Sequence, residues 1–425
     1  MTTTYSRSLQ ALAILSVTIM LFSGCLKDTC TNVYSYKLYK PIYMGFDVLR
    51  SAVKSLPAED LKSTGKIYYK APYIFISEVD KGIHIIDNTD PASPQNISFI
   101  NIPGCIDIAV KDNILYADSY IDLVAIDIKD PLNVKEVSRT MNVFPNRTYT
   151  NGWSFDPANG VITGWTETDT TVEQNCGQYY PIKAFEDVFV ASTTSGGGAT
   201  SNTSVSPGNG IAGSMARFAI YDQYLYCLDY AAMKMFDIST AAKPVSGSTV
   251  TMPWNIETIF PYDHYLFIGS TTGVSIYDNA NPSSPSFVSQ LSHVSSCDPV
   301  VVQGNYAYAT LRDGNSCQGF SNELDVIDIS NIHNPVLKTT VPFNHPFGLG
   351  IDQEHLFICD DASGLKSLDA TDPLAITLSE TITAGATRDV IPLGNLLLLI
   401  STDGLYQFDY SSGSLVQLSY LPISK

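Results

Sequence analysis

Eight side chains that could bind or transform a polar ligand lie just before or just after short apolar segments of the chain. They are Asp107, Arg217, Glu257, Asp298, Arg312, His345, Arg388 and Asp389. Carboxylates supply the oxygen ligands that a hard divalent cation such as Ca²⁺ requires, and guanidinium groups bind carboxylate or sulfate through paired hydrogen bonds. Solvated loop acids are the alternative interpretation on an acidic protein. The eight residues form one site only if the apolar segments bring them to a common centre.

A metal site in this set would use Glu257, Asp298 and Asp389, and an enzyme would use His345 as its acid or base. The sequence contains no G-x-S-x-G elbow, no Walker loop, no H-E-x-x-H motif and no dinucleotide fingerprint. Of the six His, only His345 lies where a reacting group would help. The pattern therefore favours binding over catalysis.

The elements that must position these residues are repeated along the chain. Residues 82–94, GIHIIDNTDPASP, are typical of an apolar strand that ends in Asp and is followed by a Pro-containing turn. Seven variants are visible, spaced 40, 110, 41, 50, 41 and 40 residues apart, and they end in Asp87, Asp127, Asp237, Asp278, Asp328, Asp369 and Asp409. A period near 40 residues predicts one β-propeller blade per repeat.

Each repeat also has an apolar strand, a small turn and a second strand upstream of its Asp, as in residues 106–119. We therefore expect a four-stranded antiparallel blade with strands a to d in chain order. The d-to-a and b-to-c loops then emerge on one face, where they bring the eight side chains into one funnel. The repeated Asp residues would lie on the other face and accept N–H bonds of the Pro turns, which is a structural role.

The spacing of 110 residues leaves about 70 residues beyond one period. It contains a strand-turn-strand pattern at residues 152–165 and a low-complexity segment at residues 192–210. This surplus, at about residues 144–212, is either an eighth, degenerate blade or an insertion in a seven-bladed ring. Eight blades are favoured, because the Asp237 repeat has its own first two strands. Residues 65–69 and 414–423 are expected to close the ring by completing shared sheets.

The repeat resembles the LVIVD-repeat family, in which an apolar run ending in Asp precedes a DPxxP-like turn. The matching residues are 123–127 (LVAID) and 325–328 (DVID). Residues 213–218, 257–262, 296–302 and 403–411 are also similar to segments of full-length LVIVD-repeat lipoproteins of Gram-negative envelopes. This resemblance covers most of residues 66–418. It implies a β-propeller, but it brings no established reaction, substrate or catalytic residue.

The N-terminus has the pattern of a secretory signal, with Arg7, an apolar run at residues 9–22 and small residues before Cys25. The sequence LFSGC resembles a lipobox, although Phe22 replaces the usual aliphatic residue, and it implies a lipid on Cys25. We therefore expect a signal peptide at residues 1–24, a tether at 25–64 and the propeller at 65–425. Within the tether, apolar residues at helical spacing predict a short amphipathic helix over residues 45–56 that packs against the propeller.

The charge and the cysteines agree with an exported protein. The net charge of −18 disfavours a nucleic-acid partner. Eight cysteines are present, and Cys297 and Cys317 are expected to reach the same rim of one blade and form a disulfide. Cys227 and Cys359 end strands b and are expected to be buried thiols, whereas the pairing of Cys30, Cys105 and Cys176 stays open.

The sequence thus predicts an all-β protein, a propeller of seven or eight four-stranded blades with a short N-terminal helical extension. We expect it to be lipid-anchored in the bacterial outer membrane, on the periplasmic or surface side, and to bind an envelope protein or a polar ligand such as a glycan through the funnel. The alternative is a propeller hydrolase or lyase that acts on a polyhydroxylated or lactone substrate with a divalent cation in the funnel.

Overall fold

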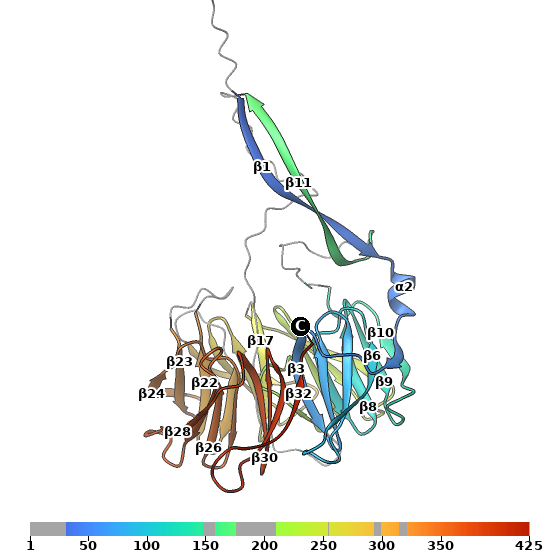
Figure 1. Cartoon of the computed structure of the whole chain (residues 1–425). Helices are drawn as coiled ribbons and strands as arrows, with labels where there is room; N and C mark the ends of the chain where they lie inside the picture. Colours follow the sequence, from blue (N-terminus) through green and yellow to red (C-terminus); the bar gives the residue numbers. More distant parts are fainter. Residues whose placement is uncertain are drawn as a thin grey trace, which may run out of the picture. The chain divides into compact units, whose positions relative to one another are not determined.

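The protein folds into a ring of antiparallel sheets. The computed structural model describes residues 31–145, 147, 158–175, 210–253, 255–292, 299–313 and 321–424. Seven sheets with four consecutive strands each form the blades of a β-propeller (Figure 1). Of the predicted seven or eight blades, seven is correct, and the favoured number of eight is wrong.

The first blade consists of β3 (Thr64–Lys70), β4 (Tyr73–Glu78), β5 (Gly82–Asp87) and β6 (Gln95–Asn101). Two short strands extend it. At the outer edge, β2 (Lys54–Pro57) pairs with β6, and at the inner edge β12 (Ile211–Ala212) pairs with β3.

The other six blades have the same order of four strands. Blade 2 is β7 (Ile108–Lys111), β8 (Ile114–Ser119), β9 (Asp122–Asp127) and β10 (Lys135–Thr140). Blade 3 is β13 (Phe218–Tyr221), β14 (Tyr224–Asp229), β15 (Ala232–Asp237) and β16 (Val245–Thr251). Blade 4 is β17 (Ile256–Tyr262), β18 (Tyr265–Ser270), β19 (Gly273–Asp278) and β20 (Ser286–Ser292).

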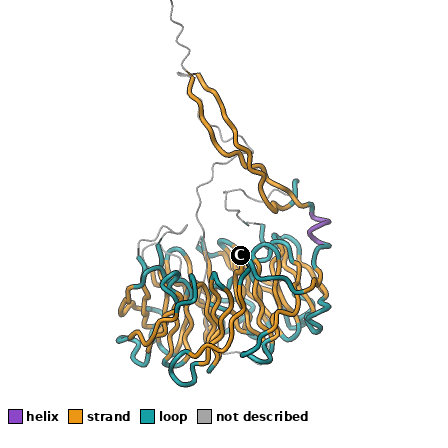
Figure 2. The backbone as a smooth tube through the Cα atoms, viewed as in Figure 1, coloured by secondary structure: helices purple, strands orange, loops and turns teal. Residues whose placement is uncertain are grey.

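Blade 5 is β21 (Val300–Gln303), β22 (Tyr306–Leu311), β23 (Glu323–Asp328) and β24 (Val336–Pro342). Blade 6 is β25 (Leu349–Asp352), β26 (His355–Cys359), β27 (Leu365–Asp369) and β28 (Thr377–Ile382). Blade 7 is β29 (Thr387–Leu393), β30 (Leu396–Ser401), β31 (Gly404–Asp409) and β32 (Val416–Pro422). The loops gather at the two ends of the blades (Figure 2).

The apolar core lies between neighbouring blades, because each strand alternates side chains toward the sheet on either side. The innermost strands β3, β7, β13, β17, β21, β25 and β29 contact one another in this order around the axis. Between blades 7 and 1 the core contains Ile67, Ile76, Ile391 and Leu398, all buried. Burial on both faces explains why the strands are nearly continuous apolar runs.

The seven repeated Asp residues have the predicted structural role. In every blade, Oδ1 of the Asp accepts the N–H of the residue two positions later, at 2.8–2.9 Å, which closes an Asx turn. These hydrogen bonds favour the ionised carboxylate, so the side-chain and backbone donors of Ser330, together with Lys338, lower the pKa of Asp328 to about 2. This prediction is confirmed.

Serines on the outermost strands connect one blade to the turn of the next. Ser98 Oγ donates to Pro131 O at 2.7 Å, Ser248 Oγ to Ser283 O at 2.6 Å, and Ser289 Oγ to Ile332 O at 2.5 Å. The same bond closes the ring, because Ser419 Oγ of blade 7 donates to Pro91 O of blade 1 at 2.7 Å.

The predicted closure by shared sheets is wrong. Residues 65–69 lie in blade 1 and residues 414–423 belong to blade 7, and each sheet is complete by itself. The backbone contribution to closure is a single parallel bridge between Leu61 and Ile423. Inside the ring, the buried amides of Asn88 and Gln407 exchange two hydrogen bonds, at 3.0 and 2.7 Å. Side chains and apolar packing therefore replace the shared sheet.

The N-terminal helix is shorter than predicted. Helix α2 spans Phe46–Arg50, and Leu49 is buried with Tyr120 and Ile121 of blade 2. The expected packing against the propeller is present. Residues 54–57 form β2 instead of continuing the helix, because pairing with β6 satisfies their backbone groups at the open edge of blade 1.

The surplus between blades 2 and 3 does not form an eighth blade in the described residues. There β1 (Thr31–Met44) and β11 (Val161–Asn175) form a separate two-stranded sheet. Most of this sheet, residues 31–41 with 165–175, belongs to a compact unit of its own. Lys37 Nζ donates to Glu167 Oε2 at 2.8 Å across this pair. Among the residues that the structure describes, no helix has the length and apolar character to cross a membrane.

Candidate polar ligand site on the funnel face

The funnel face is the end of the ring at which the seven innermost strands begin. Lys66, Asp107, Arg217 and Asp389 occupy equivalent positions there, one residue before Ile67, Ile108, Phe218 and Val390, which pair at the same register with the second strands of their blades. They belong to blades 1, 2, 3 and 7, which are neighbours around the ring. The equivalent register of the blades therefore places alternating charges side by side.

Asp107 is the centre of this charged group. Its side chain is 1% exposed, and it forms ion pairs with Lys66 and with Arg217 Nε, the latter at 3.3 Å. The Arg217 N–H also donates to Asp107 Oδ1 at 3.2 Å. Burial lowers the pKa of Lys66, although Asp107 opposes this shift. The pair of cations thus fixes one buried carboxylate at the centre of three blades.

A second carboxylate supports Asp107 from behind. Asp118 Oδ1 accepts the N–H groups of Ile106 and Asp107 at 2.7 and 2.8 Å. Its other oxygen lies 3.5 Å from Arg147 Nη1. Burial raises the pKa of Asp118, and the nearby cations and backbone donors oppose this rise.

The axis of the ring is occupied by the chain itself. We call residues 210–217 the axial segment. Gly213 N donates to Ile67 O at 3.3 Å in blade 1, and Ala216 O accepts Ile259 N at 3.0 Å in blade 4. Met215 O accepts Lys66 Nζ, and Ser214 Oγ lies 3.5 Å from Leu349 N in blade 6. Contacts with blades on opposite sides show that this segment crosses the channel.

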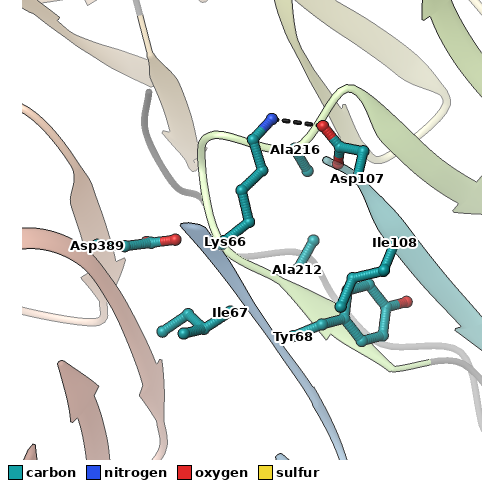
Figure 3. Close-up of a pocket in the computed structure, with 9 residues that line it drawn as sticks. Lys66, Ile67, Tyr68, Asp107, Ile108, Ala212, Ala216 and Asp389 are labelled. Atoms are coloured by element: carbon teal, nitrogen blue, oxygen red, sulfur yellow. Dashed lines mark hydrogen bonds and ion pairs between the residues drawn. The ribbon is translucent and has the colours of Figure 1, made fainter. Parts of the chain in front are cut away.

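Asp389 lies beneath the axial segment, and its carboxyl points toward β3 (Figure 3). The side chain is buried, and a Cβ added to Gly213 would lie 2.7 Å from both carboxyl oxygens. Neither oxygen has a hydrogen bond of normal geometry. Burial therefore raises the pKa of Asp389 well above its ordinary value, although nearby backbone N–H groups and Lys66 oppose the rise. A side chain at position 213 would therefore force the Asp389 carboxyl group to move.

A second group of funnel residues surrounds one aromatic ring. We call Arg312, Phe347 and Arg388 the Phe347 platform, because the two guanidinium carbons lie 4.4 and 4.2 Å from the ring centroid. Arg388 Nη1 is held by Asp361 Oδ1 at 3.0 Å. His345 packs its edge against Phe347, with 5.1 Å between the ring centroids.

His345 is enclosed by acceptors. Its Nδ1 lies 3.1 Å from Asp361 Oδ2, and its Nε2 lies 3.0 Å from the carbonyl oxygen of Asp313. Both ring nitrogens thus face groups of the chain, and the imidazole joins the loops of blades 5 and 6. The arrangement suits a residue that orders the rim.

Glu257 connects the two groups electrostatically. It lies in β17 of blade 4, and burial raises its pKa, while Arg312, Lys66 and Arg217 oppose that rise in this order. A single carboxylate is therefore within electrostatic range of cations from blades 1, 3 and 5.

The funnel face thus collects seven of the eight residues singled out from the sequence. Asp107 forms an ion pair with Arg217. Arg312 and Arg388 both pack on the ring of Phe347, and His345 lies beside them. Glu257 lies between these two groups, and Asp389 lies beside Lys66. Asp298 lies outside the described residues.

Sequence reasoning missed Lys66 and Phe347 as partners of this group. Lys66 could have been found by hairpin alignment, because it has the same register in blade 1 that Asp107 has in blade 2. Phe347 gave no such signal, since an apolar residue before a strand is typical of a core position.

The expected metal site, with Asp298, and the expected disulfide both include residues outside the described parts of the chain, so both stay predictions. In the parts of the chain that the structure describes, no group of three or more His, Cys, Asp or Glu could hold a metal ion. Cys25, Cys297 and Cys317 lie outside those parts, so the lipid attachment and the disulfide stay predictions. Cys227 and Cys359 are buried thiols, as predicted, and Cys105 is a third.

Comparison with known proteins agrees with the repeat. The LVIVD repeat matches residues 296–342, which span blade 5. No curated protein matches the chain.

Several solved structures are similar to the chain at low identity. A computationally designed protein, Ika8, has 10% identity and a TM-score of 0.49 over 87% of this chain and 92% of that chain. A functionally unknown protein from Desulfotomaculum acetoxidans DSM 771 has 11% identity and a TM-score of 0.48 over 84% and 94%. A protein from Lactobacillus plantarum has 12% identity and a TM-score of 0.48 over 92% and 97%. At these values they carry no argument about function. The chain is a seven-bladed repeat β-propeller with an LVIVD repeat in its fifth blade.

Proposed function

We propose that this propeller is a binding scaffold of a bacterial cell envelope, attached to the outer membrane by a lipid on Cys25, and that it holds a partner protein at the rim of the funnel face. The observation that carries the proposal is the convergence of charged side chains from six blades around an axis that the axial segment crosses. Such a rim offers many polar contacts to a partner protein.

The distribution of Arg supports the funnel face as the binding surface. After Arg7, the chain has six Arg, and all six lie at this end of the ring: Arg50, Arg139, Arg147, Arg217, Arg312 and Arg388. The turns at the other end contain the seven repeated Asp residues. Because Arg is enriched at protein interfaces and forms forked hydrogen bonds, its segregation favours the funnel face.

The binding role is tested by capture from envelope extracts with an immobilised chain that starts at residue 26. We expect this chain to retain a partner that Arg217→Ala loses. The matched control is Lys338→Ala, which removes a cation from the ion pair with Asp328, at 2.9 Å, on the outer strand of blade 5. Melting temperatures of all three chains show whether they are folded.

Hydrogen exchange on the captured complex then locates the contact. Protection of the b-to-c and d-to-a loops supports the proposal. Equal capture by all three chains, or protection confined to outer strands, contradicts it.

The membrane attachment is tested separately. The full chain, expressed in a Gram-negative host, should incorporate radiolabelled palmitate and sediment with outer membranes. Cys25→Ala should lose both properties. A soluble, unlabelled full chain would contradict lipid anchoring without affecting the proposed binding role.

A further inference from the structure

We infer that the Phe347 platform is a carboxylate-binding subsite that takes an acidic peptide segment of the partner protein. This inference rests on the binding role proposed above and names the chemistry of the ligand. It depends on the orientation of Arg388, the rigidity of its surroundings and the charge of the funnel face.

The ring of Phe347 orients the two guanidinium groups without using their hydrogen-bond donors. A guanidinium that lies on an aromatic face directs its N–H groups outward from its edge, where they can fork a carboxylate. Arg388 uses Nη1 for Asp361 at 3.0 Å, and its side chain is still 34% exposed. In this proposal the exposed part of Arg388 is the point at which a ligand carboxylate binds.

The surroundings hold this edge in place before a ligand arrives. Asp361 contacts both Arg388, at 3.0 Å, and His345, at 3.1 Å, and His345 in turn contacts the backbone of Asp313 at 3.0 Å. Loops from blades 5 and 6 and a strand of blade 7 are thus linked through two side chains. A pre-ordered Arg loses less conformational entropy on binding than a free one.

The local charge favours an anion despite the net charge of the chain. Asp389 near the axis is buried, and desolvation raises the pKa of Asp389 and of Glu257, which favours their neutral forms. The guanidinium groups of Arg217, Arg312 and Arg388, which are positively charged side chains, lie on the same face. The rim therefore opposes a ligand carboxylate less than the sequence charge of −18 suggests.

The platform fits a peptide better than a sugar. Carbohydrate recognition by an aromatic ring needs an open ring face, but Phe347 is 5% exposed and already carries two guanidinium groups. A Glu or Asp side chain needs only the guanidinium edge. The geometry thus favours carboxylates on a flexible chain.

The test is calorimetric titration of the chain that starts at residue 26 with N-acetylated, C-amidated hexaglutamate at low salt. Hexaglutamine is the uncharged control peptide. We expect hexaglutamate to bind and hexaglutamine not to bind. Arg388→Ala should weaken binding about tenfold or more, because a charge-assisted hydrogen bond is lost.

Two further variants separate the geometry from the charge. Arg388→Lys keeps the charge but loses the forked edge, and we expect it to weaken binding about tenfold as well. Lys338→Ala, on the outer strand of blade 5, should stay within about twofold of the unchanged chain, since exposed charges far from a site have small effects.

The subsite is overturned if Arg388→Lys binds hexaglutamate with full affinity. It is also overturned if hexaglutamate gives no heat while partner capture still depends on Arg217. Both results leave the binding role intact. Tighter binding of an oligogalacturonate of equal charge overturns the assignment to a peptide.

Discussion

The contact between Asn88 and Gln407 closes the ring, and its removal should weaken the whole propeller. The two amides are 4% and 0% exposed and exchange two hydrogen bonds between blades 1 and 7. Gln407→Ala leaves one donor and one acceptor of Asn88 buried without partners. At about 1–3 kcal/mol for each unpaired group, we expect the free energy of unfolding to fall by about 3 kcal/mol.

A double-mutant cycle isolates this contact from the loss of side-chain packing. Asn88→Ala alone should cost about 3 kcal/mol by the same argument, because the Gln407 amide is then unpaired. In the double variant no buried amide remains at this junction, so its cost should be about 2 kcal/mol less than the sum of the single costs.

The cycle is measured by urea unfolding of the chain that starts at residue 26, followed by far-ultraviolet circular dichroism and by fluorescence. Coincident transitions establish that a single free energy applies. Tyr226→Phe is compared with these variants, because it removes a hydrogen bond at an ordinary junction, between blades 3 and 4, where the Tyr226 hydroxyl donates to Asn279 Oδ1 at 2.9 Å. A coupling energy below about 0.5 kcal/mol between Asn88 and Gln407 would refute this account of ring closure.

Three further predictions concern the blades themselves. Gly273→Ala should lower the free energy of unfolding by about 3 kcal/mol, because φ is 137° and a Cβ would lie 2.0 Å from Leu291 O. The control Gly304→Ala should cost about 1 kcal/mol, because φ is 59° there and the space around the position is open. Equal losses of the two variants in urea unfolding would contradict this prediction. Asp328 has its folded pKa lowered to about 2, so its stabilising contribution is complete above the unfolded value near 3.8 and is lost as the pH falls toward 2. The stability difference between the chain and Asp328→Asn, measured in urea, should therefore shrink from pH 6 to pH 3, and a constant difference would refute the shift. Burial raises the pKa of the Cys227 and Cys359 thiols, so mass spectrometry should find these thiols alkylated only after unfolding. Rapid alkylation of the folded chain would contradict this prediction, because it would show that the thiols are accessible.

Part of the candidate site was predictable because it depends on register within one blade. Asp107 and Arg217 are recognisable from hairpin alignment alone, since each directly precedes a first strand. Lys66 lies inside β3, but the same alignment places it at the equivalent register of blade 1. In contrast, the pairing of Arg388 with Phe347 depends on contacts between blades 6 and 7, for which the sequence contains no local signal.

The sequence alone determined the blade. Each repeat has three local features: an apolar strand, an Asp at its end, and a turn whose backbone N–H donates to that Asp. Their period of about 40 residues specifies a repeated four-stranded sheet. Because local hydrogen bonds and alternation set these features, they can be read without knowing what lies beside them.

Only the tertiary structure decided how the blades meet. Three features depend on residues that are far apart in the sequence. They are the number of seven blades, the ring closure through Asn88 and Gln407, and the course of the axial segment across the channel. Asp389, for example, is an ordinary strand residue until Gly213 covers it. The physical reason is that burial and pairing of charges are set by neighbouring blades, whose packing the repeat does not specify.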